Sequence, residues 1–187
     1  HMEHNYIIAR FDDGHMERSI KLCLFLGARA FVSLGVKKIR LTGGEPLIRH
    51  NITSLVSQIG QLEGLNELNL TTNGSQLTKY SKQLREFGVN RINISIDSLK
   101  QDRFKRITRT GELSQVLDGI DAAIGAGFDK IKLNAVILKG RNEDEILDLV
   151  DFAVDKGVDI SFIEEMPLGM IDEHNRALSF CRCSIKF

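Results

Sequence analysis

The sequence predicts an α/β fold with parallel strands, in the form of a partial (β/α)6 barrel. Three observations predict this fold. A pattern of a glycine, an apolar residue, two variable residues and an alternating run recurs five times. Apolar residues at helical spacing separate the copies, and one face of each expected strand is polar. The five copies span residues 35–42, 64–71, 88–95, 127–134 and 157–164.

The elements follow from these patterns in chain order. Residues 6–11 are expected to form a first strand, and Glu17 to Leu34 a first helix. Each repeat is predicted to start with a left-handed glycine that ends a helix and to continue as a strand. Asn142 and Glu145 form a candidate capping box before the last helix. The alternation of six strands with about six helices predicts parallel strands with right-handed crossovers, in either a partial barrel or an open doubly wound sheet. The other apolar helical stripes lie near residues 55–62, 77–87, 113–124 and 146–153.

The alternation along the strands predicts two unlike faces. Apolar pairs such as Ile39 and Leu41 are expected to face the helices. Because buried parallel strands are normally apolar on both faces, the polar partners favour an interior that holds a polar or charged ligand. A two-layer sheet with a solvated face is the alternative. The polar positions are Arg40, Thr42, Asn69, Thr71, Asn93, Ser95, Lys132, Asn134 and Ser161.

The candidate ligand-binding residues lie at the predicted carboxyl ends of the strands, where α/β folds bind their ligands. Gly43 and Gly44 let a backbone approach a ligand closely, and Glu45 suits an ammonium group. Arg40 and Lys132 suit a phosphate or a carboxylate. Each loop alone also fits a simpler role. Asp97–Ser98 fits a helix cap, and Met166 fits core packing.

Five motifs in order resemble the radical S-adenosylmethionine (SAM) GTP cyclases of molybdenum cofactor biosynthesis. They are IRLTGGEP at 39–46, TTNG at 71–74, SIDS at 95–98, KLN at 132–134 and FIEEMP at 162–167. The resemblance runs from about Phe31 to about Gly169. It implies a partial six-stranded barrel in which an iron–sulfur cluster cleaves SAM to a radical that attacks GTP, giving a cyclic pyranopterin precursor. The implied SAM-binding residues are Gly43, Gly44, Glu45, Ser95 and Met166, and the implied GTP-binding residues are Arg40, Thr71 and Lys132.

The positions of the cysteines differ from the pattern that this resemblance implies. The resemblance implies three cysteines after the first strand, but residues 12–16 contain none. Cys23 stands alone. Cys181 and Cys183 do not have the spacing of the cluster-binding cysteines, and they lie after the last expected strand. Convergent thiolates hold iron–sulfur clusters, so we predict neither a metal site nor a catalytic residue in this chain. A non-catalytic α/β scaffold that keeps part of the SAM and nucleotide rim is therefore the main alternative. A (β/α) lyase or aldolase with Lys132 as a Schiff-base nucleophile is a weaker one.

Composition limits the kinds of partner and the cellular location that fit this chain. The 187 residues carry 25 Lys+Arg and 25 Asp+Glu, a balance that argues against nucleic-acid or membrane-surface partners. The few cysteines fit a reduced, cytoplasmic protein, and the resemblance implies small-molecule ligands. Open sheet edges are compatible with a homo-oligomer. We expect an atypical segment at 1–30, a radical SAM barrel core at 31–169 and an atypical tail at 170–187.

Overall fold

The computed structural model describes residues 6–10 and 17–164, and the side chains from Leu22 onward. Contacts divide the chain into two compact units. The first contains the residues up to Ile94 together with Gln115–Ile131. The second contains Ser95–Ser114 together with the residues from Lys132 onward. This division does not test the predicted boundaries at residues 30 and 169, which stay a prediction.

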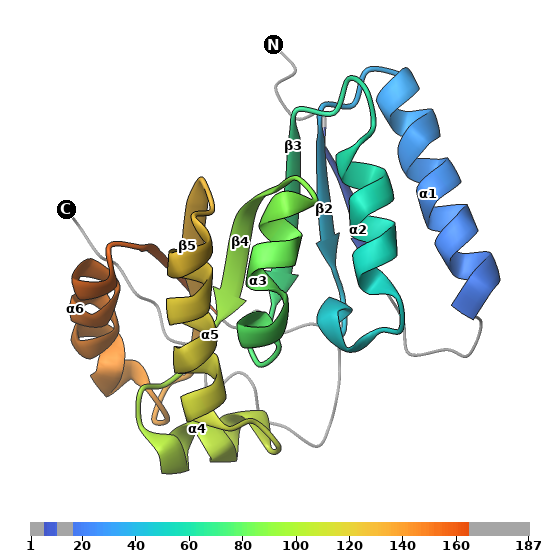
Figure 1. Ribbon diagram of the computed structural model, residues 1–187. Helices are drawn as coiled ribbons and strands as arrows, with labels where there is room; N and C mark the ends of the chain where they lie inside the picture. Colours follow the sequence, from blue (N-terminus) through green and yellow to red (C-terminus); the bar gives the residue numbers. More distant parts are fainter. Residues whose placement is uncertain (1–5, 11–16, 165–187) are drawn as a thin grey trace. The chain divides into compact units, whose positions relative to one another are not determined.

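The first unit is a parallel α/β sheet. Strands β1, β2, β3 and β4 are neighbours in that order, and each pair is parallel. Figure 1 shows α1, α2 and α3 along one side of these strands. The elements are β1 (Tyr6–Arg10), α1 (Glu17–Ser33), β2 (Lys38–Thr42), the short 3-10 helix η1 (Pro46–Ile48), α2 (Ile52–Gly60), β3 (Glu67–Thr72), α3 (Leu77–Glu86), β4 (Val89–Ser95) and α5 (Leu113–Ala126).

The apolar face of these strands forms the core of the first unit, as the alternation predicts. The helices contribute buried residues from their predicted apolar stripes. Burying this apolar surface is the main force that holds helices onto a sheet. The buried strand residues are Ile39, Leu41, Leu68, Leu70, Ile92 and Ile94, and the buried helix residues include Leu55, Val56, Ile59, Leu77, Leu84, Val116 and Ile120.

The second unit contains two parallel strands with a helix, α6, packed against them. Its elements are α4 (Gln101–Thr108), β5 (Lys130–Ile137), the 3-10 helix η2 (Glu143–Glu145), α6 (Ile146–Lys156) and β6 (Asp159–Glu164). Strand β5 pairs with β6, and Asn134 is in register with Ser161. Ile160 and Phe162 pack against a small core of Ala135, Ile137 and Leu149, as predicted.

The five repeat glycines are confirmed in their predicted conformation, with φ between +66° and +98°. A side chain is strained there, so glycine sets the point where each helix or turn gives way to a strand. The five are Gly35, Gly64, Gly88, Gly127 and Gly157. Among the helices that the structure describes, none combines the length and the apolar character that crossing a membrane requires.

Gly60 offers a test of how tightly the first unit is packed. A Cβ at Gly60 would overlap the carbonyl oxygen of Phe87. We therefore expect Gly60→Ala to lower the free energy of unfolding by about 3 kcal/mol, because backbone must shift to make room. Gly125 of α5 has nothing within 4 Å of the same added atom. The control Gly125→Ala should raise stability by up to about 1 kcal/mol. Urea denaturation measures both, and equal effects would contradict this packing.

Candidate functional site

The loop after β2 carries the glycine pair that the sequence singles out. Gly43 and Gly44 have φ of +97° and +48°, so both lie in the left-handed region. The chain then enters η1, with Glu45 as its N-cap and Pro46 as its first residue. A proline suits this place because the first helical residue has no N–H to contribute. The turn therefore places a carboxylate directly after two residues that lack side chains.

The Glu45 carboxylate ties the loop after β2 to the loop after β3. Its Oε1 accepts hydrogen bonds from the Leu47 N–H at 3.0 Å and from the Thr72 hydroxyl at 2.7 Å. Its Oε2 accepts one from the Asn73 N–H at 2.5 Å. Since a carboxylate oxygen can accept about two hydrogen bonds, Oε2 keeps room for one more donor. Glu45 can thus hold the two loops and still receive an ammonium group.

Arg40 and Thr71 lie in the same unit as this loop. Arg40 lies on β2 three residues before Gly43, and its half-buried side chain keeps Nε buried without a hydrogen-bond partner. Thr71 is half-buried near the end of β3. The first unit therefore holds five of the predicted site residues: Arg40, Gly43, Gly44, Glu45 and Thr71.

The remaining predicted residues belong to the second unit or lie outside the described residues. Ser95 is exposed at the end of β4, and Lys132 is half-buried on β5 in register with Asp159 of β6. Met166, Cys181 and Cys183 lie outside the described residues.

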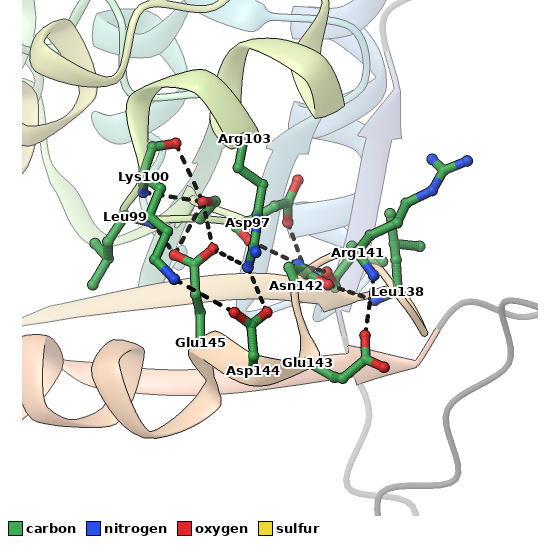
Figure 2. A network of polar contacts seen from close by, with 12 residues as sticks. Asp97, Leu99, Lys100, Arg103, Leu138, Arg141, Asn142, Glu143, Asp144 and Glu145 are labelled. Atoms are coloured by element: carbon green, nitrogen blue, oxygen red, sulfur yellow. Dashed lines mark hydrogen bonds and ion pairs between the residues drawn. The ribbon is translucent and has the colours of Figure 1, made fainter.

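A network of polar contacts joins the loop after β4 to the loop after β5 within the second unit (Figure 2). Glu145 is fully buried at its centre. It accepts hydrogen bonds from the Ser98 hydroxyl at 2.8 Å and the Leu99 N–H at 2.8 Å. It also forms an ion pair of 2.6 Å with Arg103 of α4. Arg103 contacts Asp144 as well, so one guanidinium serves two carboxylates.

Asp97 and Asn142 complete the network. Asp97 Oδ1 accepts a hydrogen bond from the Val136 N–H at 2.8 Å, and burial raises the pKa of its carboxyl group. The Asn142 amide donates to the carbonyl oxygens of Asp97 and Val136 and accepts from the Leu138 N–H. These side chains satisfy backbone groups that neither strand pairing nor a helix reaches.

The predicted capping box of Asn142 and Glu145 is therefore wrong. Neither side chain caps the backbone of η2 or α6. Their hydrogen bonds go instead to Asp97, Ser98, Leu99, Val136 and Leu138. Asp97 and Ser98 do not cap α4 either, since Lys100 occupies its N-cap position. The sequence spacing suits a local cap, but these side chains bind the end of β5 and the distant loop after β4 instead.

The described residues do not supply the ligands of an iron–sulfur cluster. Among them, no three His, Cys, Asp or Glu side chains converge as a metal site would require. Cys23 is an exposed residue of α1. An iron–sulfur cluster is held by several thiolates, and the part of the chain that is described offers this one.

The sequence of residues 24–153, which is more than half of the chain, matches the radical SAM superfamily. The chain belongs to the radical SAM superfamily. The fold agrees with this membership, because parallel strands in chain order are the arrangement of the superfamily's partial barrel.

Curated relatives are about 60% identical to this radical SAM chain over the aligned residues. GTP 3',8-cyclase of Pseudomonas putida (strain W619) is 60% identical over 158 residues, covering 84% of the chain and 47% of the relative. GTP 3',8-cyclase of Marinobacter nauticus is 61% identical over 154 residues, covering 82% of the chain and 46% of the relative. The chain thus spans about half the length of the curated relatives it matches.

Solved structures support the fold at much lower identity. SuiB of Streptococcus suis, bound to S-adenosylmethionine, is 20% identical with a TM-score of 0.63. That match covers 83% of this chain and 36% of SuiB. Coproporphyrinogen III oxidase of Escherichia coli, a radical SAM enzyme, is 13% identical with a TM-score of 0.59, covering 84% of this chain and 42% of the oxidase.

The predicted site omits three residues of the polar strand face. Asn69, Arg91 and Asn93 each bury a polar side-chain atom that has no hydrogen-bond partner. The sequence pattern places Asn69 and Asn93 on the polar face. Arg91 lies two residues before Asn93, so the same alternation places it on that face too. The alternation therefore indicates the face on which these residues lie, but the lack of partners for their atoms depends on the three-dimensional arrangement.

Glu145 provides a stability test of the polar network. We expect Glu145→Ala to lower the free energy of unfolding by about 3 kcal/mol, because it leaves Arg103, the Ser98 hydroxyl and the Leu99 N–H without this partner. The matched control is Glu112→Ala, whose partly exposed carboxylate pairs with Lys105 at 3.5 Å and should contribute less than about 1 kcal/mol. Chemical denaturation compares the two, and equal losses would show that the buried network stabilises the fold no more than an exposed ion pair does.

Proposed function

We propose that this radical SAM chain is the barrel segment of a GTP 3',8-cyclase, and that it binds SAM and GTP at the carboxyl ends of its strands. The observation that carries the proposal is the 60% identity to GTP 3',8-cyclases over 84% of the chain. Because the chain spans about half of those relatives, the proposal concerns ligand binding by this polypeptide and not the complete reaction.

The first unit supports the SAM part of the proposal through Gly43, Gly44 and Glu45. Two successive left-handed glycines leave space beside the backbone for the amino-acid end of SAM. The remaining acceptor position on Glu45 Oε2 suits the ammonium group of that end. Ser95 and Met166 are further proposed SAM ligands, on the basis of resemblance alone.

Arg40, Thr71 and Lys132 are the proposed GTP ligands. The unpartnered Nε of Arg40 supports this role, because a buried donor without a hydrogen-bond partner is unfavourable until a ligand or water supplies one. Thr71 and Lys132 rest on resemblance and on their polar-face positions. A guanidinium and an ammonium are the groups that proteins use to bind phosphate oxygens.

The proposal covers ligand binding and leaves out radical chemistry, because the described residues contain one cysteine, Cys23. The described residues do not fit an iron–sulfur cluster, so no radical step is assigned to this chain. A rim that binds SAM or a nucleotide without turning them over is the form of the proposal that this observation favours. A cytoplasmic location and small-molecule ligands, with no nucleic-acid partner, belong to the same proposal.

Calorimetric titration tests the GTP site. We expect Arg40→Ala and Lys132→Ala each to weaken GTP binding by about tenfold, since each removes one charged contact. Lys82→Ala, at an exposed position of α3, should leave the affinity unchanged. SAM binding by the same variants should also stay unchanged. Wild-type affinity for GTP in both variants would refute the assignment of these two residues.

Cluster reconstitution tests the proposed lack of radical chemistry. We expect anaerobic treatment of the chain with iron and sulfide to yield no stoichiometric iron–sulfur cluster, because Cys23, Cys181 and Cys183 do not have the spacing of a cluster-binding loop. Optical and EPR spectra measure the result. A stoichiometric cluster that cleaves SAM would overturn this part of the proposal.

A further inference from the structure

Four buried polar atoms without hydrogen-bond partners lie on neighbouring strands of the first unit. They are Nε of Arg40 on β2, Oδ1 of Asn69 on β3, and Nε of Arg91 and Oδ1 of Asn93 on β4. Asn69 and Asn93 are only 7% and 6% exposed. Folded proteins leave few buried polar atoms without a partner, so four on three adjacent strands point to a ligand.

The strand register places three of these residues in a row. Arg40 pairs with Asn69 across β2 and β3, and Asn69 pairs with Arg91 across β3 and β4. Two strand spacings, roughly 10 Å, therefore separate the backbones that carry the two arginines. Asn93 lies two residues after Arg91, on the same face and next to Thr71 in the register. The row thus has an arginine at each end and an amide between them.

A β-bulge turns Arg91 toward this face. Leu68 pairs with Val89, but the next residue, Asn69, pairs with Arg91, so β4 contains one extra residue at this point. Without it, Asn69 would pair with Asn90, and Arg91 would register with Leu70 on the helix-covered face. The Asn90 side chain accepts a hydrogen bond from the Leu68 N–H at 2.9 Å and so supplies that backbone donor at the bulge. Bulges that redirect a side chain are common next to functional sites.

The charges on this face favour an anion. Partial burial acts to raise the pKa of Glu67, but the hydrogen bond from Asn69, the ion pair with Lys38 and the charge of Arg91 together lower it. Glu67 is thus a charged carboxylate that already has partners. This one carboxylate faces three positive charges, those of Lys38, Arg40 and Arg91, and water can satisfy the unpartnered atoms as hydrogen-bonding groups but cannot balance the remaining charge.

We infer that Arg91 is a second anion-binding arginine, which acts with Arg40 on either side of Asn69 to hold the phosphate chain of a nucleotide. Two guanidinium groups on separate strands suit an anion whose charge is spread over several phosphates. The free amide oxygens of Asn69 and Asn93 accept hydrogen bonds from hydroxyl or N–H groups of the same ligand. This inference deepens the proposed function and rests on it only for the identity of the nucleotide.

Calorimetric titration of the full chain with inorganic triphosphate tests the inference without SAM or a nucleoside. We expect the wild type to bind triphosphate, and Arg91→Gln and Arg40→Gln each to weaken that binding by about tenfold. Arg91→Lys should lie between wild type and Arg91→Gln, because it keeps the charge and loses the planar fork. The matched control is Lys82→Gln on α3, which should stay within about twofold of wild type.

Thermal unfolding of the ligand-free proteins separates a binding role from a structural one. Since Arg91 buries an unpartnered donor, Arg91→Gln should unfold at the wild-type temperature or above it. A lower unfolding temperature would show that Arg91 supports the fold, and would overturn the inference. Triphosphate affinity of Arg91→Gln equal to that of Lys82→Gln would also overturn it, as would a wild type that binds no triphosphate.

Titration with SAM keeps this inference distinct from the proposed function. A wild type that binds SAM but no triphosphate would overturn the role of Arg91 and leave the SAM site standing. A wild type that binds triphosphate through Arg91 but neither SAM nor GTP would support the anion site and refute the GTP cyclase assignment.

Discussion

The first unit is organised by the constraint that parallel strands need crossover helices, and that crossovers of one hand come back on one side of the sheet. The helices α1, α2 and α3 cover a single face of β2, β3 and β4 (Figure 1). Buried apolar residues of these strands line that face. The opposite face has no such cover from these helices, so its residues must be polar or must find other partners. The row of Arg40, Asn69 and Arg91 is the result.

The sequence predicts much of this arrangement because both periodicities are local. Glycine after a helical stripe, followed by alternation, locates the strands and their left-handed starting residues. The polar face and the Gly43–Gly44 turn follow from the same alternation. The bulge at Asn90 does not, because one extra residue in β4 becomes visible only when the strand is set beside β3. The partners of Glu145 escape prediction for the same reason, as Ser98 and Arg103 lie more than 40 residues away in the chain.

One carboxylate in each unit has the same structural role, which is to join two loops that follow strands. Glu45 joins the loops after β2 and β3, and Glu145 joins the loops after β4 and β5. Each accepts a backbone N–H from a loop other than its own, where regular pairing has ended. A charged acceptor makes such hydrogen bonds stronger than a neutral one would. The loops at the carboxyl ends of the strands are therefore held by carboxylate side chains.

The interleaving of the two units in the sequence has a consequence for how the chain is made. The polypeptide passes from one unit to the other after Ile94, after Ser114 and after Ile131. Domains generally fold in the order in which they leave the ribosome. Here the first unit lacks most of α5 until residues that belong to the second unit have already emerged. No single contiguous fragment contains either unit alone, so the nascent chain must hold its first four strands without a complete helical cover until α5 arrives.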